Sequence, residues 1–155
     1  GKYAEQSSTL VEENGVPRLA MDAVDDNLST YSHTNCDMPW WLVDLGFNAP
    51  IEHVTIVNRW CEDPNDAPGC LCQLSDATVF LMDEDWWVVD YEEVGDACGL
   101  HESVHFLTTA SPSASPTLEV TDPNNLSCPM ARYVKIEGTT GEQVAMFEVS
   151  VMSGG

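Results

Sequence analysis

Short runs of alternating apolar and polar residues dominate the chain, and they predict strands. In the first clear run, Trp41, Val43 and Leu45 fall on one face at a period of two. Gly46 and the proline four residues later are expected to end this strand. A second strand is predicted at Val54–Asn58. Polar residues then stand at the ends of apolar strands, which is a common place for a binding site on a rigid scaffold.

The same pattern continues to the end of the chain without a convincing amphipathic helix. The further predicted strands are Thr78–Met82, Trp86–Tyr91, Val104–Leu107, Thr117–Val120, Tyr133–Ile136 and Gln143–Val151, with a hairpin turn at Asp83–Asp85. Many short strands and no internal repeat predict an all-β sandwich. The length of 155 residues suits one domain, residues 1–155.

Trp86 and Trp87 have two interpretations. An exposed tryptophan pair would form a flat platform for a sugar ring, whereas aromatic residues in strands are more often buried. We therefore expect both side chains to lie in the core.

Composition narrows the choice of partners. The chain has five basic and 26 acidic residues, for a formal net charge of −21. This charge disfavours nucleic acid and anionic membranes, and it suits cations and neutral ligands. Solubility in salty or calcium-rich surroundings explains the charge equally well. With 43% hydrophobic residues, the chain can bury a core.

Six cysteines, an even number, predict disulfides and a secreted, extracellular protein. Zinc is less favoured, because Cys70-Leu71-Cys72 lacks the usual two-residue spacer. Prolines, a glycine and three cysteines mark residues 60–76 as an irregular, disulfide-stapled loop. No apolar run is long enough to span a membrane, and no signal peptide is visible, so we expect a mature or trimmed form.

Oxygen-bearing side chains crowd residues 22–30. Such a loop suits a hard cation such as calcium, but its spacing is not that of an EF-hand. The residues alone favour an ordinary solvated loop. Glu148 is unusual, because it lies between apolar residues of a predicted strand, where a bare carboxylate would be costly to bury.

Several motifs occur in a fixed order along the chain. They are Gly1–Thr9, Ala23–Asn27, His33-Thr34, Pro39–Gly46, Ile51–Arg59, Arg132–Ile136 and Phe147–Val151. This ordered set resembles the F-type lectin family, the fucolectins, over nearly the whole chain. The resemblance implies a discoidin-like jelly-roll β-sandwich that binds fucose-type or related glycans.

The resemblance also implies a structural calcium ion in the 22–30 loop. Its ligands would be side-chain oxygens of Asp25, Thr30 and Glu148, with main-chain oxygens near Asp22, Asn27, Thr30 and Phe147. A cation beside Glu148 would remove the cost of burying its carboxylate. With the resemblance included, calcium becomes the favoured interpretation.

For the sugar site, the resemblance implies one histidine and two arginines. His33 matches the histidine and Arg59 the first arginine, while Gln73 stands where the second arginine is expected. The family has Gly-Asp after the first arginine, but this chain has Trp60 and Cys61. Trp60 would offer a stacking face, and Glu62 or Asp63 would have to replace the missing aspartate. We expect a groove that still binds glycan, with altered specificity or affinity.

The resemblance also implies a disulfide between Cys98 and Cys128. The pairing of Cys36, Cys61, Cys70 and Cys72 stays open, because four cysteines allow three arrangements.

Two function classes follow. The favoured one is a calcium-stabilised lectin domain whose partners are glycans or glycoproteins, with a homo-oligomer or a longer multidomain chain as a source of avidity. The alternative is a discoidin-like extracellular adhesion domain that has lost sugar recognition. An enzyme is disfavoured, because the chain offers no activated nucleophile.

Overall fold

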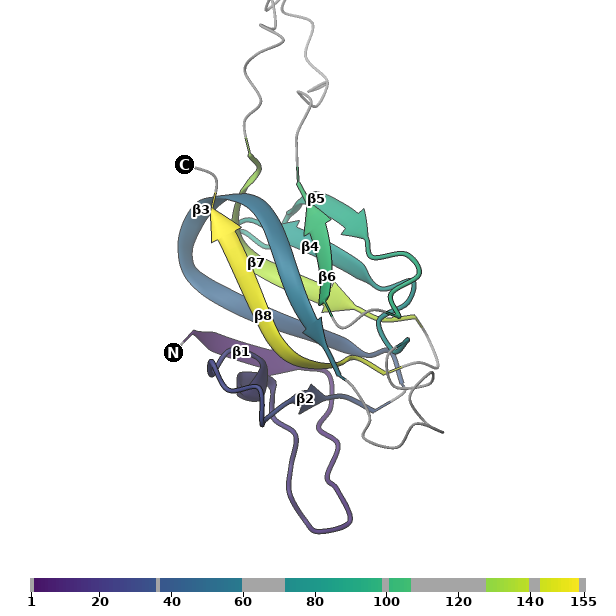
Figure 1. Ribbon diagram of the computed structural model, residues 1–155. Coiled ribbons are helices and arrows are strands. Elements are labelled where there is room, and N and C mark those ends of the chain that lie inside the picture. The colour runs from purple at the N-terminus through teal and green to yellow at the C-terminus, as the bar shows by residue number, and fades with distance from the viewer. Residues whose placement is uncertain are drawn as a thin grey trace, which may run out of the picture.

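The computed structural model is a β-sandwich, shown in Figure 1. It describes residues 2–35, 37–59, 72–98, 101–106, 128–139 and 143–153. Within these ranges the elements are β1 (Tyr3–Gln6), η1 (a 3₁₀ helix, Ala20–Ala23), β2 (Ser32–His33), β3 (Trp40–Asn58), β4 (Thr78–Met82), β5 (Val88–Glu93), β6 (His101–His105), β7 (Met130–Glu137) and β8 (Ala145–Ser153). The predicted all-β sandwich is confirmed.

β3 belongs to both layers of the sandwich. Its first half pairs with β1 and β7, and β4 and β5 extend that sheet; its second half pairs with β6 and β8, and β2 extends the other sheet. All these pairs are antiparallel. The predicted break after Gly46 was therefore wrong. Gly46 adopts a left-handed φ of 87° where the register shifts between Asp44 and Ala49, so the strand bends instead of ending.

The core lies between the two sheets. Trp41 and Val43 of the first half of β3 are buried, as predicted, and they share the core with Val54 and Ile56 of its second half. The buried indole N–H of Trp41 donates to the carbonyl of Ala20 at 2.9 Å. This hydrogen bond satisfies the polar atom of the largest core side chain and fixes η1 against the sheet.

The turn between β4 and β5 corrects one expectation. Trp86 and Trp87 are 54% and 73% exposed, so placing them in the core was wrong. Asp83 Oδ1 accepts hydrogen bonds from the amides of Asp85 and Trp87, and this turn delays the strand until Val88. Trp86 has a left-handed φ of 68° and stacks on Tyr133 with ring centroids 4.1 Å apart. The turn chemistry thus overrides the strand propensity of the tryptophans.

The other strand predictions fare better. β4 has the predicted bounds, β7 contains the predicted Tyr133–Ile136, and β8 and β6 overlap their predicted segments. The predicted strand at Thr117–Val120 lies outside the described residues. Within the described ranges, no helix has the length and apolarity needed to cross a membrane.

Candidate functional site

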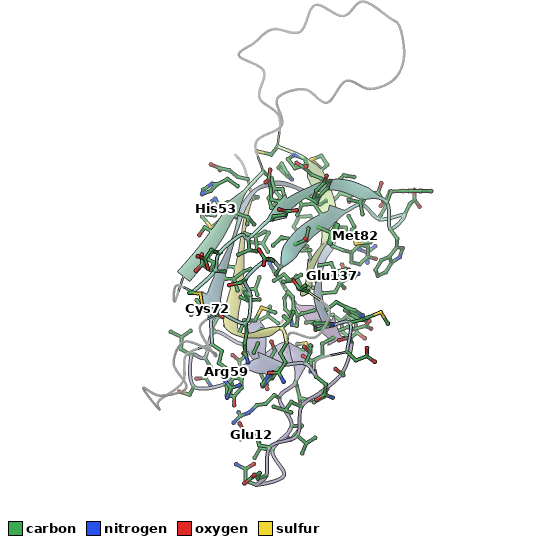
Figure 2. The ribbon with its side chains drawn as sticks, turned by 90° about the vertical axis from the view of Figure 1, so that its right-hand side faces the viewer. Glu12, His53, Arg59, Cys72, Met82 and Glu137 are labelled. Atoms are coloured by element: carbon green, nitrogen blue, oxygen red, sulfur yellow. A yellow bond between two sulfur atoms is a disulfide. The ribbon has the colours of Figure 1, made fainter. Side chains whose placement is uncertain are left out.

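Strand pairing brings His33 and Arg59 together at one end of the sandwich. β8 runs between β2 and the second half of β3, with Ala145 opposite His33 and Met146 opposite Asn58. His33 ends β2, and Arg59 directly follows the last residue of β3. The N-terminal arm between β1 and η1 extends from the same end, and Figure 2 shows Glu12 and Arg59 there.

A hydrogen-bond network joins the predicted sugar-site residues that the structure describes. Arg59 Nη1 lies 3.1 Å from His33 Nδ1, and His33 Nε2 lies 2.7 Å from Gln143 Oε1. Gln73 Nε2 donates to the same Gln143 oxygen at 2.9 Å. Because a guanidinium can only donate, Nδ1 of His33 accepts, and its Nε2 carries the proton that is donated to Gln143. Gln143 therefore fixes both the tautomer and the orientation of the ring.

His33 is held neutral. The side chain is buried, and burial lowers its pKa below the ordinary value; the Arg59 charge lowers it further, while Gln143 opposes the shift. A neutral imidazole beside a guanidinium keeps the positive charge on Arg59. The pair therefore presents one charged donor group, Arg59, at the end of β3, with the buried, oriented His33 ring behind it.

Tyr31 supports the arginine from the other side. Arg59 Cζ lies 4.6 Å from the centroid of the Tyr31 ring, and Arg18 Cζ lies 4.0 Å from it. The Tyr31 hydroxyl donates to Glu12, which also forms an ion pair with Arg18 at 2.7 Å. Both contacts lower the pKa of Glu12, so the carboxylate stays charged. Tyr31, Arg18 and Glu12 thus hold Arg59 in place, a role expected of Glu62 or Asp63, which lie outside the described residues.

The arm that carries Glu12 is a short hairpin. Val11 bridges Pro17, and the turn between them contains Asn14-Gly15, with Gly15 at a φ of 83°. Asn-Gly is the strongest short-range hairpin signal in a sequence, so this arm was predictable even though its contact with Tyr31 was not. An open cavity of about 570 Å³ lies between the arm and the arginine, lined by Leu10, Val11, Glu12, Glu13, Asn14 and Arg59.

One polar atom in this network lacks a partner. Gln73 Oε1 is buried without a hydrogen bond among the described groups. Such an atom normally costs about 1–3 kcal/mol unless a ligand or water satisfies it. The predicted stacking residue, Trp60, lies outside the described residues.

The predicted metal loop lies beside β8, close to the same end. Asp25 accepts hydrogen bonds from the Asn27 amide at 2.9 Å and from the Thr30 hydroxyl at 2.7 Å. Asp22 instead uses its carboxylate at the start of η1, where it accepts from the Leu19 amide at 2.9 Å. The loop therefore concentrates oxygen atoms, as the sequence suggested.

Glu148 completes this loop from β8, where it stands opposite Val57. Its Oε2 atom is buried and has no hydrogen-bond partner among the described groups. Burial, with the nearby charges of Asp26 and Asp25, raises the pKa of Glu148 to about 6. An unsatisfied carboxylate oxygen facing two further carboxylates is the chemistry that a hard cation relieves, so the residues fit calcium.

The fit depends on more than acidic side chains. In the described part of the chain, no three His, Cys, Asp or Glu side chains converge as a metal cluster. The set implied by the resemblance includes only two carboxylates, those of Asp25 and Glu148. A cation here would therefore rely on the Thr30 hydroxyl and on main-chain oxygens, Phe147 among them.

The disulfide pairing differs from the expected one. Cys98 bonds to Cys72, and Cys128 is a free thiol, so the pairing of Cys98 with Cys128 was wrong. Backbone hydrogen bonds beyond β4 and β5, from Asp76 to Gly95 at 2.7 Å and from Val94 to Ala77 at 2.8 Å, continue the hairpin and bring the Cys98 segment beside the Cys72 turn. The bond thereby anchors Gln73. Cys36, Cys61 and Cys70 lie outside the described residues.

Comparison with known proteins identifies the fold. The sequence matches no family model and no curated protein. Among solved structures, the lectin domain of lectinolysin complexed with Lewis b antigen is 29% identical, with a TM-score of 0.71 over 100% of this chain and 94% of that one. The chain has a discoidin-like lectin fold. A Streptococcus pneumoniae fucose-binding module is 25% identical, with a TM-score of 0.70 over 99% of this chain and 92% of that one.

More distant structures share only the lectin fold. A fucolectin from the serum of striped bass, Morone saxatilis, is 18% identical, with a TM-score of 0.60 over 99% of this chain and 46% of that one. A family 32 carbohydrate-binding module from C. perfringens, in complex with galactose, is 16% identical with a TM-score of 0.63. The predicted discoidin-like jelly roll is therefore confirmed.

Proposed function

We propose that residues 1–155 form one extracellular lectin domain that binds glycans through the end of the sandwich at Arg59, without catalysis. The observation that carries this proposal is the network in which Arg59, His33 and Gln73 converge through Gln143. A sugar hydroxyl needs directional donors and acceptors at fixed positions. In this network Arg59 lines the open cavity, and its partner His33 is held in turn by Gln143.

Fucose-type glycans are the favoured ligands. Two solved structures that share the fold and at least a quarter of the sequence are a lectin domain complexed with Lewis b antigen and a fucose-binding module. Gln73 would replace the charge of a second arginine with a neutral amide, and its buried Oε1, which has no partner among the described groups, would accept from a hydroxyl. The specificity therefore differs from that of a site with two arginines.

Calcium is the second part of the proposal. The ion would be held by side-chain oxygens of Asp25, Thr30 and Glu148 and by main-chain oxygens near Asp22, Asn27 and Phe147. Bound calcium supplies positive charge that neutralises the acidic loop. The role of this chain's residues is structural, because the loop and β8 border the strands that carry His33 and Arg59.

The test is a glycan array in the presence of calcium, comparing the wild type with Arg59→Ala. Arg132→Ala is the matched control, because Arg132 pairs with Asp44 on a different sheet surface. Loss of fucosylated-glycan binding in Arg59→Ala alone supports the proposal. Binding of another sugar class that depends on Arg59 keeps the lectin function but rejects fucose. Hydrolysis of a glycoside would reject the proposal of a non-catalytic module.

An adhesion domain without sugar binding is the second candidate. The replacement of two family positions by Trp60 and Gln73 favours it, as do the exposed Trp86 and Trp87, which offer apolar area for a protein partner. An array on which no glycan binds, with calcium bound and the protein folded, would favour this function.

A further inference from the structure

Two histidines face each other on the outer surface of the second sheet. His53 of β3 stands directly opposite His105 of β6 in the antiparallel register. Their neighbours Val54 and Val104 are buried, so the histidines lie on the opposite face of the sheet, where His105 is exposed and His53 is half-buried. His53 lies six residues before Arg59, about 20 Å along the strand, and Figure 2 shows the two well apart. The pair is therefore separate from the proposed sugar site.

The separation of the two rings suits a shared metal ion. Their centroids are 5.2 Å apart and the ring planes are inclined by 38°. Two imidazole nitrogens bound to one tetrahedral ion at about 2.0–2.1 Å place the ring centroids about 5 Å apart. The observed centroid separation is close to this value, and small side-chain rotations would bring the rings to the tetragonal geometry that copper(II) prefers.

Neither ring is committed to another group in the described part of the chain. His53 Nδ1 is buried and has no hydrogen-bond partner there, and the His105 ring lies against the His53 ring without a hydrogen bond or ion pair to a described residue. A nitrogen left unsatisfied in this way has a lone pair or a proton to offer. The pair thus has free coordination capacity, unlike His33, whose two nitrogens are both used.

The strands hold the pair rigidly. His53 lies in the centre of its sheet, with β6 on one side and β8 on the other. The Phe106 amide donates to the Glu52 carbonyl at 2.8 Å and fixes the end of β6. In the next row, the hydroxyls of Thr55 and Ser103 meet at 3.1 Å, which shows that side chains across these strands come into contact. Both histidines therefore start near the geometry they would need.

We propose that His53 and His105 form a surface site for a divalent transition-metal ion, with copper(II) bound more tightly than zinc. Imidazole suits copper and zinc, and copper stands highest in the affinity order of first-row divalent metals. Water completes the coordination. Calcium is excluded from this site, because it takes oxygen ligands. The net charge of −21 concentrates cations around the protein.

The test uses the untagged, calcium-saturated chain, titrated with copper(II) chloride or zinc chloride by calorimetry. Copper-bound protein is then examined by electron paramagnetic resonance. The expected result is one copper site whose spectrum shows two nitrogen ligands. His53→Asn and His105→Asn each weaken it at least about tenfold and remove one nitrogen. Zinc binds the same site more weakly.

Thr55→Ala is the matched control, because it alters the neighbouring row on the same face, and copper binding should be unchanged. Since all three side chains point outward, circular dichroism should show folded variants. Copper binding that survives in both histidine variants, or a spectrum with a single nitrogen, would overturn the proposal. The outcome of this test does not depend on whether the domain binds a sugar.

Discussion

Arg59 and Glu148 are charged side chains near the same end of the sandwich, but they differ in how well neighbouring groups pair with them. Arg59 contacts His33 and the Tyr31 ring, and the groups behind it are paired in turn. Glu148 has a buried oxygen without a hydrogen-bond partner in the described part of the chain, and it lies near two other carboxylates. Protein groups hold Arg59 on several sides, with Gln73 Oε1 the atom of that network left without a partner among the described residues, whereas the Glu148 region lacks a positive charge. The difference suggests that ligand binding needs no reorganisation at Arg59, while the Glu148 loop depends on a cation.

The largest expected effect is a loss of stability when the disulfide that anchors the Gln73 segment, near Arg59, is removed. Cys98→Ser breaks the bond to Cys72 and frees the segment that carries Gln73. Closing a loop with a sequence separation of 26 predicts a loss of about 3–4 kcal/mol in the free energy of unfolding. Urea denaturation measures it. Cys128→Ser is the control and should change little; an equal loss there would show that Cys128 is bonded in solution.

Removal of calcium should lower the stability of the protein through the loop of residues 22–30 and Glu148 only. At a calcium concentration about 100 times the dissociation constant, bound ion adds about 2.7 kcal/mol to the free energy of unfolding. A chelator should therefore lower the melting temperature of the wild type by about 5–10 °C. Differential scanning calorimetry measures the shift.

Glu148→Gln sharpens this experiment. The variant should melt at a lower temperature than the wild type with calcium present, and the chelator should then have little further effect. Glu92→Gln, at an exposed position on β5, is the matched control and should respond like the wild type. If the chelator lowers the melting temperature of Glu148→Gln as much as that of the wild type, there is no calcium at this loop.

Gln143→Leu should disrupt the hydrogen-bond network that holds His33 and Gln73. The change removes the oxygen that accepts from both His33 and Gln73, and so leaves two buried donors unpaired. We expect a loss of about 2 kcal/mol in the free energy of unfolding and weaker glycan binding. Gln143→Glu keeps an acceptor oxygen and should recover part of the stability. A fully stable Gln143→Leu variant would mean that the network does not order the site.

The smallest effect is a pH dependence of the calcium-free protein. The folded-state pKa of Glu148, about 6, lies above its ordinary value, so folding favours the protonated carboxyl. The stability from this group is present at low pH and is lost as the pH rises from about 4.5 to 6. After allowance for partial exposure, the loss is about 1 kcal/mol or less.

The measurement is the difference between wild type and Glu148→Gln in chelator, followed from pH 4 to pH 7 by denaturant unfolding. As the pH rises, the free energy of unfolding of the wild type should fall relative to that of Glu148→Gln. Calcium should reverse that trend, because the ion binds the charged carboxylate. A difference that stays constant over this range would reject the raised pKa.

The sequence predicted the parts of this molecule that depend on local pattern. Period-two alternation located β4, β7 and β8, and the apolar face of Trp41 and Val43 located the core. These strand signals are local, because alternation is encoded in neighbouring residues. His33 and Arg59 were named instead through the resemblance to the F-type lectin family, which rests on an ordered set of motifs over nearly the whole chain.

The features that the sequence did not predict depend on contacts between distant segments. Gln143 meets His33 across 110 residues, and no local pattern marks a glutamine as an acceptor. Glu12 reaches Tyr31 only because the arm folds back on the sheet. Trp86 was misplaced since three hydrogen bonds to Asp83 decide its turn, against its own strand propensity.

The double membership of β3 also determines how the domain would carry a mechanical load. A tethered ligand at Arg59 would pull on the end of a strand that is hydrogen-bonded along both edges, first within one sheet and then within the other. A force along that strand loads many ladder hydrogen bonds in shear at once, instead of peeling an edge strand bond by bond. The attachment point would therefore transmit tension to the middle of both sheets.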